Sequence, residues 1–227
     1  MYMNILETKH LTKIFKDGAA EICALKDVNL SIEKSTFNAV VGASGSGKTT
    51  LLNMLGGLDT PTSGSVFIDG TEITGMKDRE LSVFRRKKVG IIFQNYNLVP
   101  TLNTYENIVF PVDLDGRRVD KAFVEEVVYT LHLADRLADY PHQLSGGQQQ
   151  RAAIARALVA RPSVILADEP TGSLDSRNSQ NVAGLLKECV DTFKQTLVMI
   201  THNLELAQLA DRVIRIEDGQ IRKQEAI

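Results

Sequence analysis

The sequence predicts an α/β fold built on a parallel sheet, and two observations support this prediction. Residues 42–49 match the pattern G-x-x-x-x-G-K-[ST], between an apolar run at 38–41 that is typical of a strand and a helix-like run at 50–55. Strand and helix patterns then alternate from 164 to 216, as in the βαβ units of a parallel sheet. With 227 residues, of which 43% are hydrophobic, the chain suits one such domain with an inserted lobe.

The segment 42–49 predicts a phosphate-binding loop (P-loop). Its glycines let backbone N–H groups close around phosphate oxygens, and the start of the following helix adds a partial positive charge. Lys48 is expected to reach the β- and γ-phosphates, and the Thr49 hydroxyl to bind Mg²⁺. A flexible Gly/Ser linker is the alternative, but a linker needs neither the Lys-Thr ending nor the preceding strand. The residues expected to bind nucleotide here are Gly42, Ser44, Gly45, Ser46, Gly47, Lys48, Thr49 and Thr50.

A second anion-binding site is predicted in the segment 144–148. Ser145, Gly146 and Gly147 precede a helix-like run at 151–160, so they are expected to form a backbone nest at a helix start. A single nucleotide pocket does not need two phosphate nests in one chain. We therefore expect the two nests to face different copies of the protein.

Residues 144–151, Leu-Ser-Gly-Gly-Gln-Gln-Gln-Arg, lie downstream of the P-loop and resemble the signature motif of ABC-type ATPases. The resemblance covers nearly the whole chain, and the motifs occur in the family's order. It implies a homodimer that sandwiches ATP, in which the signature of one subunit closes over the γ-phosphate held by the P-loop of the other. The signature residues that would bind ATP in this way are Ser145, Gly146, Gly147 and Gln148.

The same resemblance implies how the single domain is organised. Residues 1–93 and 161–227 are expected to form the nucleotide-binding core with an antiparallel β subdomain, for which short strands are predicted over 5–32. Residues 94–160 are expected to form an inserted helical subdomain that carries the signature, because strand patterns vanish there. Helical spacing of apolar residues predicts its helices at 104–110, 120–131 and 147–160.

Two acidic residues end the apolar run 164–167, which looks like the Walker B strand of the family. Asp168 is expected to help hold Mg²⁺, and Glu169 to act as the general base that polarises the attacking water. The alternative is an ordinary buried strand that ends in a solvated acidic pair.

Two further polar residues follow strand-like runs and match positions of the family. Gln94 matches the glutamine that senses Mg²⁺ and water and links the nucleotide to the membrane partner. His202 matches the switch histidine, which contacts the γ-phosphate and orients Glu169. By itself a glutamine after a strand carries no such meaning, and a lone histidine there is ordinarily structural. The predicted catalytic residues are thus Lys48, Gln94, Glu169 and His202, and the predicted metal ligands are Thr49, Gln94 and Asp168.

Three shorter segments complete the comparison with the family. Phe15 stands where relatives often have a tyrosine that stacks on adenine; the alternative is an ordinary core residue at a strand end. Ser35 and Thr36 occupy a turn where relatives usually carry Gly-Glu, which is expected to strain the turn. Residues 173–175 match the D-loop, which crosses the dimer interface in the family, and they also predict a cap for a helix at 176–192.

Composition limits the partners and the compartment. The formal net charge of −2 provides no strong basic field, so no nucleic-acid partner is expected. The one dense basic run, 85–88, is interpreted as a solvated helix end rather than a nucleic-acid patch. Cys23 and Cys189 lack metal-ligand spacing and are expected to be small core residues in a reducing cytoplasm. Residues 1–10 lack the apolar core of a signal peptide.

The apolar stretches of the sequence, such as 51–58, are too short to span a bilayer, and the P-loop is not repeated. An ABC-type ATPase of this kind is expected to act on a separate membrane permease, as a peripheral subunit on the cytoplasmic face. The segment that follows Gln94 is rich in apolar groups up to Leu102. Such a loop either packs into its own core or marks a binding site, and docking of the permease is expected near residues 94–102.

A subgroup is indicated by four segments, 56–59, 61–64, 97–100 and 167–172. They resemble those of macrolide exporters, lipoprotein-release ATPases and bacitracin-type peptide-resistance transporters, many of which transmit mechanical work across the membrane. An importer ATPase remains an alternative, as does a soluble ABC ATPase of DNA repair or translation. An inactive ATPase is disfavoured because the predicted catalytic residues are all present.

Overall fold

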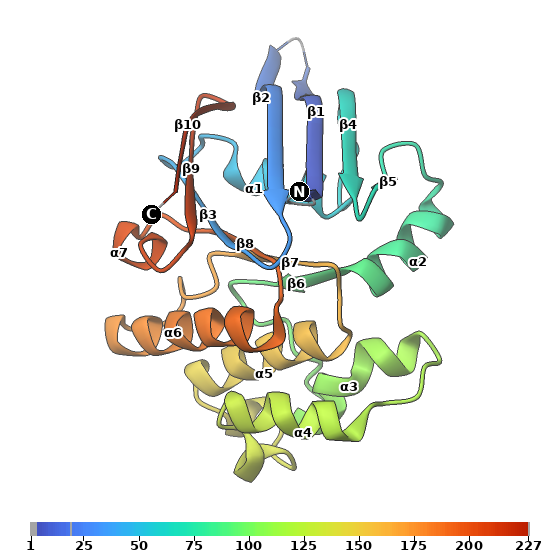
Figure 1. The fold of residues 1–227 in the computed structure, drawn as a ribbon, viewed down its shortest axis with the longest axis vertical. Helices are drawn as coiled ribbons and strands as arrows, with labels where there is room; N and C mark the ends of the chain where they lie inside the picture. Colours follow the sequence, from blue (N-terminus) through green and yellow to red (C-terminus); the bar gives the residue numbers. More distant parts are fainter. Residues whose placement is uncertain (1–3, 19, 227) are drawn as a thin grey trace.

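The computed structural model describes residues 4–18 and 20–226, which form two β-sheets and a set of helices (Figure 1). The smaller sheet is antiparallel in the order β2-β1-β4-β5, with strands β1 (Asn4–Asp17), β2 (Ala20–Glu33), β4 (Ser63–Ile68) and β5 (Thr71–Glu72). The larger sheet has the order β10-β9-β3-β8-β7-β6, with strands β3 (Phe37–Val41), β6 (Val89–Ile92), β7 (Val164–Asp168), β8 (Leu197–Ile200), β9 (Arg212–Glu217) and β10 (Gln220–Ala226). Its pairs are parallel except for β9 with β10. The predicted α/β fold, with a parallel core sheet and an antiparallel sheet beside it, is confirmed.

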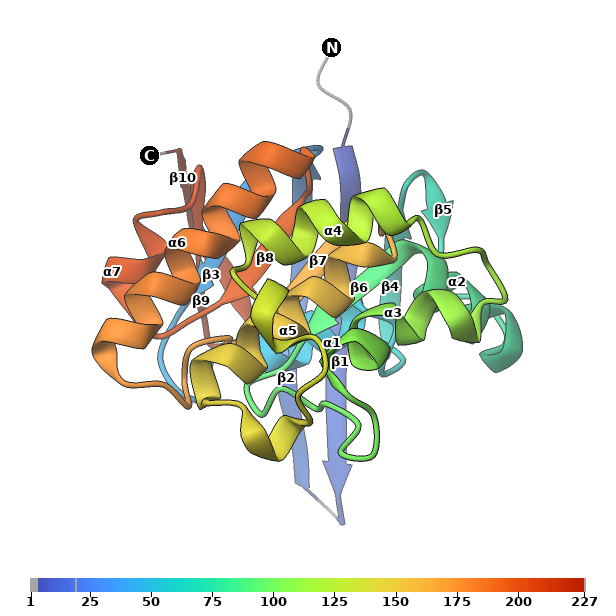
Figure 2. The same cartoon turned by 90° about the horizontal axis from the view of Figure 1, so that it is seen from below.

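Helices cover the larger sheet on both faces (Figures 1 and 2). Helix α1 (Lys48–Leu55) lies between the two sheets, and a helical layer covers the opposite face, formed by α3 (Thr104–Leu114), α4 (Lys121–Thr130), α5 (Gly146–Val159) and α6 (Ser176–Phe193). The remaining helices are α2 (Asp78–Lys88), α7 (Leu204–Ala207) and two short 3-10 turns, η1 (Ala134–Arg136) and η2 (Pro141–Gln143). Within residues 4–18 and 20–226, every helix is too short or too polar to cross a lipid bilayer.

The helices of this layer begin at polar residues that cap them. Asn103 accepts a hydrogen bond from the Glu106 N–H at the start of α3, and Asp175 accepts one from the Asn178 N–H at the start of α6. These side chains satisfy N–H groups that have no partner within the helix. The predicted cap before 176–192 is therefore present as Asp175. Helix α3 continues beyond the predicted end at 110 and includes Pro111, although a proline inside a helix lacks the N–H of one helical hydrogen bond and crowds the preceding turn.

Two hydrophobic cores follow from the alternation of side chains along the buried strands. In β3, Ala39 and Val41 face the core shared with α3 to α6, whereas Val40 faces the core shared with α1 and the antiparallel sheet. The strands β7 and β8 alternate in the same way. Both faces of the larger sheet are thus covered, which is why its strands read as continuous apolar runs. The polar ends of these strands are the positions left for a site.

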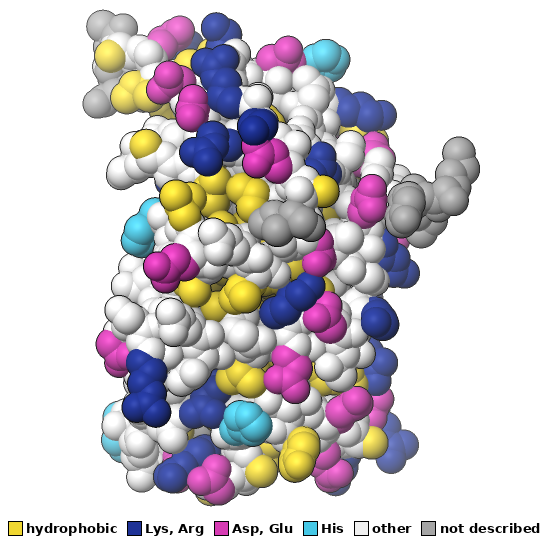
Figure 3. All heavy atoms as spheres, turned by 60° about the vertical axis from the view of Figure 1, so that its left-hand side comes forward, with side chains coloured by type: hydrophobic (Ala, Val, Ile, Leu, Met, Phe, Trp, Pro, Cys, Tyr) yellow, Lys and Arg dark blue, Asp and Glu magenta, His cyan; other side chains and the backbone are white. Residues whose placement is uncertain are grey.

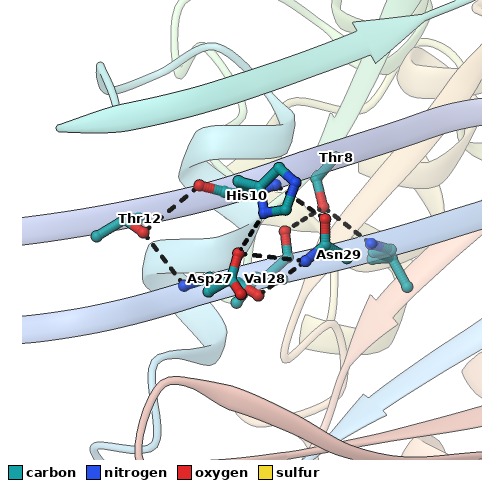
Figure 4. Close-up of polar contacts among 7 residues, drawn as sticks. Thr8, His10, Thr12, Asp27, Val28 and Asn29 are labelled. Atoms are coloured by element: carbon teal, nitrogen blue, oxygen red, sulfur yellow. Dashed lines mark hydrogen bonds and ion pairs between the residues drawn. The ribbon is translucent and has the colours of Figure 1, made fainter.

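The antiparallel sheet differs from its prediction, because two strands of 14 residues replace the short strands expected over 5–32. Register shifts interrupt the β1–β2 pairing, and His10 and Asp27 have positive φ values of 50° and 51°. Side chains hold these irregular positions together: Asn29 Oδ1 accepts from the His10 N–H, and His10 Nδ1 lies 2.7 Å from Asp27 Oδ1 (Figure 4). The bulges therefore bend the strands without ending them.

Several smaller predictions have definite outcomes. The basic run 85–88 is the last turn of α2, as interpreted, but it is only partly solvated: three of its four residues are half-buried, and Arg86 pairs with Asp115. Ser35 has a φ of 59°, so the turn is strained as expected. Cys189 is buried, but the expectation for Cys23 was wrong, because its position on β2 is exposed. On the face drawn in Figure 3, acidic and basic side chains are interspersed. Of the segment 1–10, residues 1–3 lie outside the described residues.

Candidate nucleotide site

The P-loop connects β3 to α1, and its glycines are required by close contacts as well as by backbone angles. Gly47, which precedes the first residue of α1, has a φ of 101°, and a Cβ there would lie 2.4 Å from the carbonyl oxygen of Ala24. At Gly42 a Cβ would lie 2.3 Å from the carbonyl oxygen of Ile216. Neighbouring strands thus press against the loop from outside, and only glycine fits at these positions.

Polar groups of the loop fit an anionic ligand. Lys48 Nζ lies over the loop, donating to the carbonyl oxygens of Gly42 at 2.9 Å and Ala43 at 2.8 Å. The Ser46 hydroxyl is buried and, among the described residues, finds no hydrogen-bond partner. A buried polar group of this kind requires an explanation, and a phosphate oxygen provides one. A helix start and an ammonium group at the same place favour negative charge.

Asp168 ends β7 at the carboxyl edge of the parallel sheet. Burial raises the pKa of this carboxyl group, and the charge of Glu169 raises it further, while a hydrogen bond with Thr49 and the charge of Lys48 act in the opposite direction. The contact with Thr49 brings a carboxylate and a hydroxyl together. Oxygen ligands of this type suit Mg²⁺, which is commonly held by one or two carboxylates together with substrate phosphates.

Glu169 and His202 form a pair across the ends of β7 and β8. Glu169 has a φ of 44°, and its N–H donates to the carbonyl oxygen of Ile200 at 3.1 Å, so the chain turns sharply at the strand end. His202 Nδ1 lies 2.8 Å from Glu169 Oε2. An ionised carboxylate only accepts hydrogen bonds, so Nδ1 carries the proton and donates it. The predicted orienting contact between these residues is present in the structure.

Gln94 lies just beyond β6, beside the turn that follows Glu169. A Cβ at Gly172 would lie 2.8 Å from Gln94 Nε2, and the Ser173 hydroxyl donates to the Gln94 carbonyl oxygen at 3.3 Å. The Gly172 N–H in turn donates to the Glu169 carbonyl oxygen at 2.9 Å. Gln94 is therefore packed against the segment that carries the predicted general base.

A cleft of about 520 Å³ is the centre of the site. It is lined by Ser44, Gly45, Gly47, Lys48, Thr49, Thr50, Glu169 and His202, which the sequence predicted, and by Ile22, Cys23, Ala24, Asp218 and Gly219, which it did not. The last two form the β9–β10 turn, and the Gly219 N–H donates to the Ser46 carbonyl oxygen at 3.0 Å. The Asp-Gly pair signals a turn in the sequence, but nothing local indicates that this turn lies against the P-loop.

The predicted signature residues are not among the described residues that line this cleft. Ser145 caps α5: its hydroxyl oxygen accepts from the Gln148 N–H at 3.3 Å, and its own N–H donates to Gln148 Oε1 at 2.8 Å. Gly146 is covered by the Tyr96 hydroxyl, because a Cβ there would lie 2.9 Å from that oxygen. The signature is thus a well-formed helix start that stands apart from the P-loop of the same chain.

Phe15 is also absent from the cleft lining, although its neighbour on β2 is part of it. Phe15 pairs with Ile22 across the two strands, and Ile22 lines the cleft. Phe15 is 41% exposed, so the alternative of an ordinary core residue is wrong. Paired residues of an antiparallel sheet point to the same face, which places Phe15 beside the rim of the cleft.

A phosphate-binding loop after β3, acidic residues at the end of β7, two strands away in the same sheet, and the parallel sheet that carries both define a P-loop nucleoside triphosphatase. Comparison with known proteins narrows this class, because the ABC transporter family matches residues 25–172. The macrolide export ATP-binding/permease protein MacB of Aggregatibacter actinomycetemcomitans is 44% identical over 96% of this chain and 34% of its own length. The bacitracin export ATP-binding protein BceA of Halalkalibacterium halodurans is 42% identical over 98% of this chain and 88% of its own.

A solved structure agrees with these relatives. It is a dimeric post-hydrolysis state of the ATP-binding cassette MJ0796 bound to ADP and Pi, a protein of Methanocaldococcus jannaschii. It superimposes with a TM-score of 0.87 at 40% identity, covering 97% of this chain and 98% of that one. The chain belongs to the ABC transporter family: it is an ATP-binding subunit that binds and hydrolyses ATP.

Proposed function

We propose that this ATPase subunit works as a homodimer that sandwiches two ATP molecules and drives a separate membrane permease, in export or in mechanical transmission. The observation that carries the proposal is the separation of the P-loop cleft from the signature helix within one chain. The P-loop cleft of each chain would be completed by the signature helix of a second copy. The dimeric form of the MJ0796 cassette, 40% identical, supports this arrangement.

In the proposed reaction each chain contributes distinct groups. Lys48 and the P-loop N–H groups hold the β- and γ-phosphates, and Glu169 accepts a proton from the attacking water while His202 orients its carboxylate. Thr49, Gln94 and Asp168 would hold Mg²⁺, which when bound neutralises charge on the phosphates. Phe15 would stack on the base. Donors at the start of α5 of the partner copy would bind the γ-phosphate, so hydrolysis would loosen the dimer.

The export assignment rests on the named relatives. MacB and BceA carry macrolide export and bacitracin export in their names, and they are 44% and 42% identical to this chain. MacB is named as an ATP-binding and permease protein, and this chain matches 34% of it. A subunit that serves such a permease would sit at the cytoplasmic face of the membrane. Residues 94–160 would then act as the helical subdomain that moves against the core, with hinges near Gln94 and Pro162.

The segment 94–102 is proposed as the docking site of the permease, and its shape is held from within the chain. The Asn107 side chain, fully buried, bonds the N–H and the carbonyl oxygen of Val99 and the carbonyl oxygen of Leu102. Arg156 of α5 donates to the carbonyl oxygens of Tyr96 at 2.7 Å and Asn97 at 2.6 Å. The loop and the signature helix are therefore joined by direct hydrogen bonds, so a displacement of the loop would be transmitted to α5.

Charged substitutions separate docking from folding in this loop. Val99 and Leu102 are half-buried, whereas Leu98 packs against the core beneath the helical layer. Val99→Asp and Leu102→Asp should leave the isolated subunit folded and hydrolysing ATP, but abolish its co-purification with the permease from membranes. Leu98→Asp is the comparison variant and should lower the thermal stability itself. Wild-type co-purification of the Val99 and Leu102 variants would place the docking site elsewhere.

A further inference from the structure

Phe15 is fixed by a lysine that covers one face of its ring. Lys13 Nζ lies 4.8 Å from the centroid of the Phe15 ring. The lysine side chain is only 13% exposed, although Phe15 itself is 41% exposed. An ammonium group over an aromatic face is attracted by the electrons of the ring. One face of Phe15 is therefore occupied by the protein, and a planar ligand can stack only on the other.

Lys13 is itself held in place from outside its strand. Its ammonium group donates to Asp59 Oδ1 at 2.8 Å and to the carbonyl oxygen of Thr60 at 2.7 Å. Thr62 extends the attachment, because its N–H donates to the Thr12 carbonyl oxygen and its Oγ1 accepts from the Ile14 N–H, both at 2.9 Å. The segment 59–62 thus binds the end of β1 on both sides of Lys13.

This segment also connects Phe15 to the phosphate end of the site. Residues 59–62 follow α1, and α1 begins with the P-loop lysine, Lys48. The segment leads into β4 on one side of β1, whereas Ile22, which lines the cleft, belongs to β2 on the other side. The groups that anchor Lys13 therefore come from the side of β1 away from the cleft, and the Ile22 side is left for a ligand.

We propose that Lys13, anchored by the segment 59–62, is a positioning residue that fixes Phe15 as a one-sided platform for the base of the nucleotide. The proposal rests on the proposed stacking role of Phe15. It gives a role to the sequence Gly56-Gly57-Leu58-Asp59 and to the following 61–64, which the phosphate chemistry leaves unexplained. The same stretch of chain, 42–62, then sets both the phosphate cradle and the orientation of the platform.

The test compares ATP with inorganic tripolyphosphate, which carries the phosphates without a base. Calorimetric titration of Lys13→Met should show ATP affinity lowered by about three- to tenfold, as expected for the loss of a cation–π contact and the ordering it provides. Tripolyphosphate affinity should not change. In a Phe15→Leu background, Lys13→Met should cause no further loss, because the two residues act through one contact.

Lys9 provides a matched control on the same strand. Lys9 Nζ lies 4.8 Å from the centroid of the Phe67 ring, a pair that does not line the cleft. Lys9→Met should therefore leave the affinity for both ligands unchanged. The proposal is overturned if Lys13→Met and Lys9→Met have the same affinity for ATP, or if Lys13→Met lowers the affinities for ATP and tripolyphosphate equally. Equal affinity of the wild type for the two ligands would also overturn it, but would leave the P-loop assignment intact, whereas binding of neither would contradict the proposed nucleotide site.

Discussion

The P-loop cleft and the signature helix are built in opposite ways. The cleft brings together residues from segments that are far apart in the sequence, including 22–24, 44–45, 47–50, Glu169, His202 and 218–219. The signature, by contrast, is complete within a few residues: Ser145 and Gln148 cap each other, and α5 follows at once. The cleft therefore forms only when the whole chain is folded, whereas the signature requires only the start of one helix. A local motif that is structurally complete but faces no ligand of its own chain is suited to act on another copy.

The capping geometry also determines which backbone N–H groups of the signature are free to bind an anion. The N–H groups of Ser145 and Gln148 are used within the cap. The first turn of a helix has four N–H groups without helical partners, so those of Gly146 and Gly147 remain as donors. They lie at the positive end of the helix dipole, which favours an anion. In the proposed site the P-loop would enclose the phosphates, whereas the signature would contact the γ-phosphate only with the N–H groups at its helix start.

The largest effect is expected at the cleft. Glu169→Gln removes the group proposed to accept a proton while keeping the size of the side chain, so ATP hydrolysis should fall by about a hundredfold or more. ATP binding should persist, and an ATP-bound dimer should accumulate on size-exclusion chromatography. Glu188→Gln changes an exposed glutamate on α6 and is the control. Near-wild-type turnover of Glu169→Gln would remove Glu169 from its assigned role.

A smaller effect on stability separates the structural role of the signature from its chemical role. Ser145→Ala removes the cap of α5. Asp120→Ala removes the cap of α4, because the Asp120 side chain accepts a hydrogen bond from the Phe123 N–H. Each should cost about 1 kcal/mol of unfolding free energy, measured by denaturant titration. Only Ser145→Ala should also lower ATP hydrolysis. If both variants lost stability and neither lost activity, the signature would be no more than a helix cap.

The smallest effect concerns the half-buried carboxylate of Asp168, at the end of β7. The pKa of Asp168 is raised in the folded state above the reference of 3.8, mainly by burial. The folded state therefore binds more protons between the two pKa values, and stability falls as pH rises through that interval. Asp168→Asn removes this loss, so its melting temperature without nucleotide or metal should exceed that of the wild type at pH 7. The difference should shrink as pH approaches 4; a lower melting temperature at pH 7 would contradict the burial argument.

The sequence predicted those parts of the molecule that depend on local patterns. The P-loop, the strand end at Asp168 and the helix starts at Ser145 and Asp175 each have residues whose chemistry is readable at their own positions. Parallel strands also bring their carboxyl ends to one edge, so the meeting of Glu169 with His202 follows from the alternation of strands and helices.

Long-range contacts were not predictable in this way. The turn at Asp218 and Gly219 supports the P-loop only because β9 lies beside β3, and Cys23 is exposed only because β2 reaches the rim of the cleft. The long β1–β2 ribbon was missed because His10 and Asp27 interrupt the alternation of apolar residues. Their side-chain hydrogen bonds, shown in Figure 4, maintain the pairing where the pattern alone suggests an end.

The most direct test of the divided site uses two inactive variants. Lys48→Ala disables the P-loop and Ser145→Arg disables the signature, so each homodimer should fail to hydrolyse ATP, while Ser145→Arg still binds it. In a mixed dimer the intact P-loop of one chain would face the intact signature of the other, which restores one complete site. We predict that mixing the variants raises hydrolysis above the sum of their separate rates. No gain in a mixture shown to contain mixed dimers would mean that P-loop and signature act within the same chain.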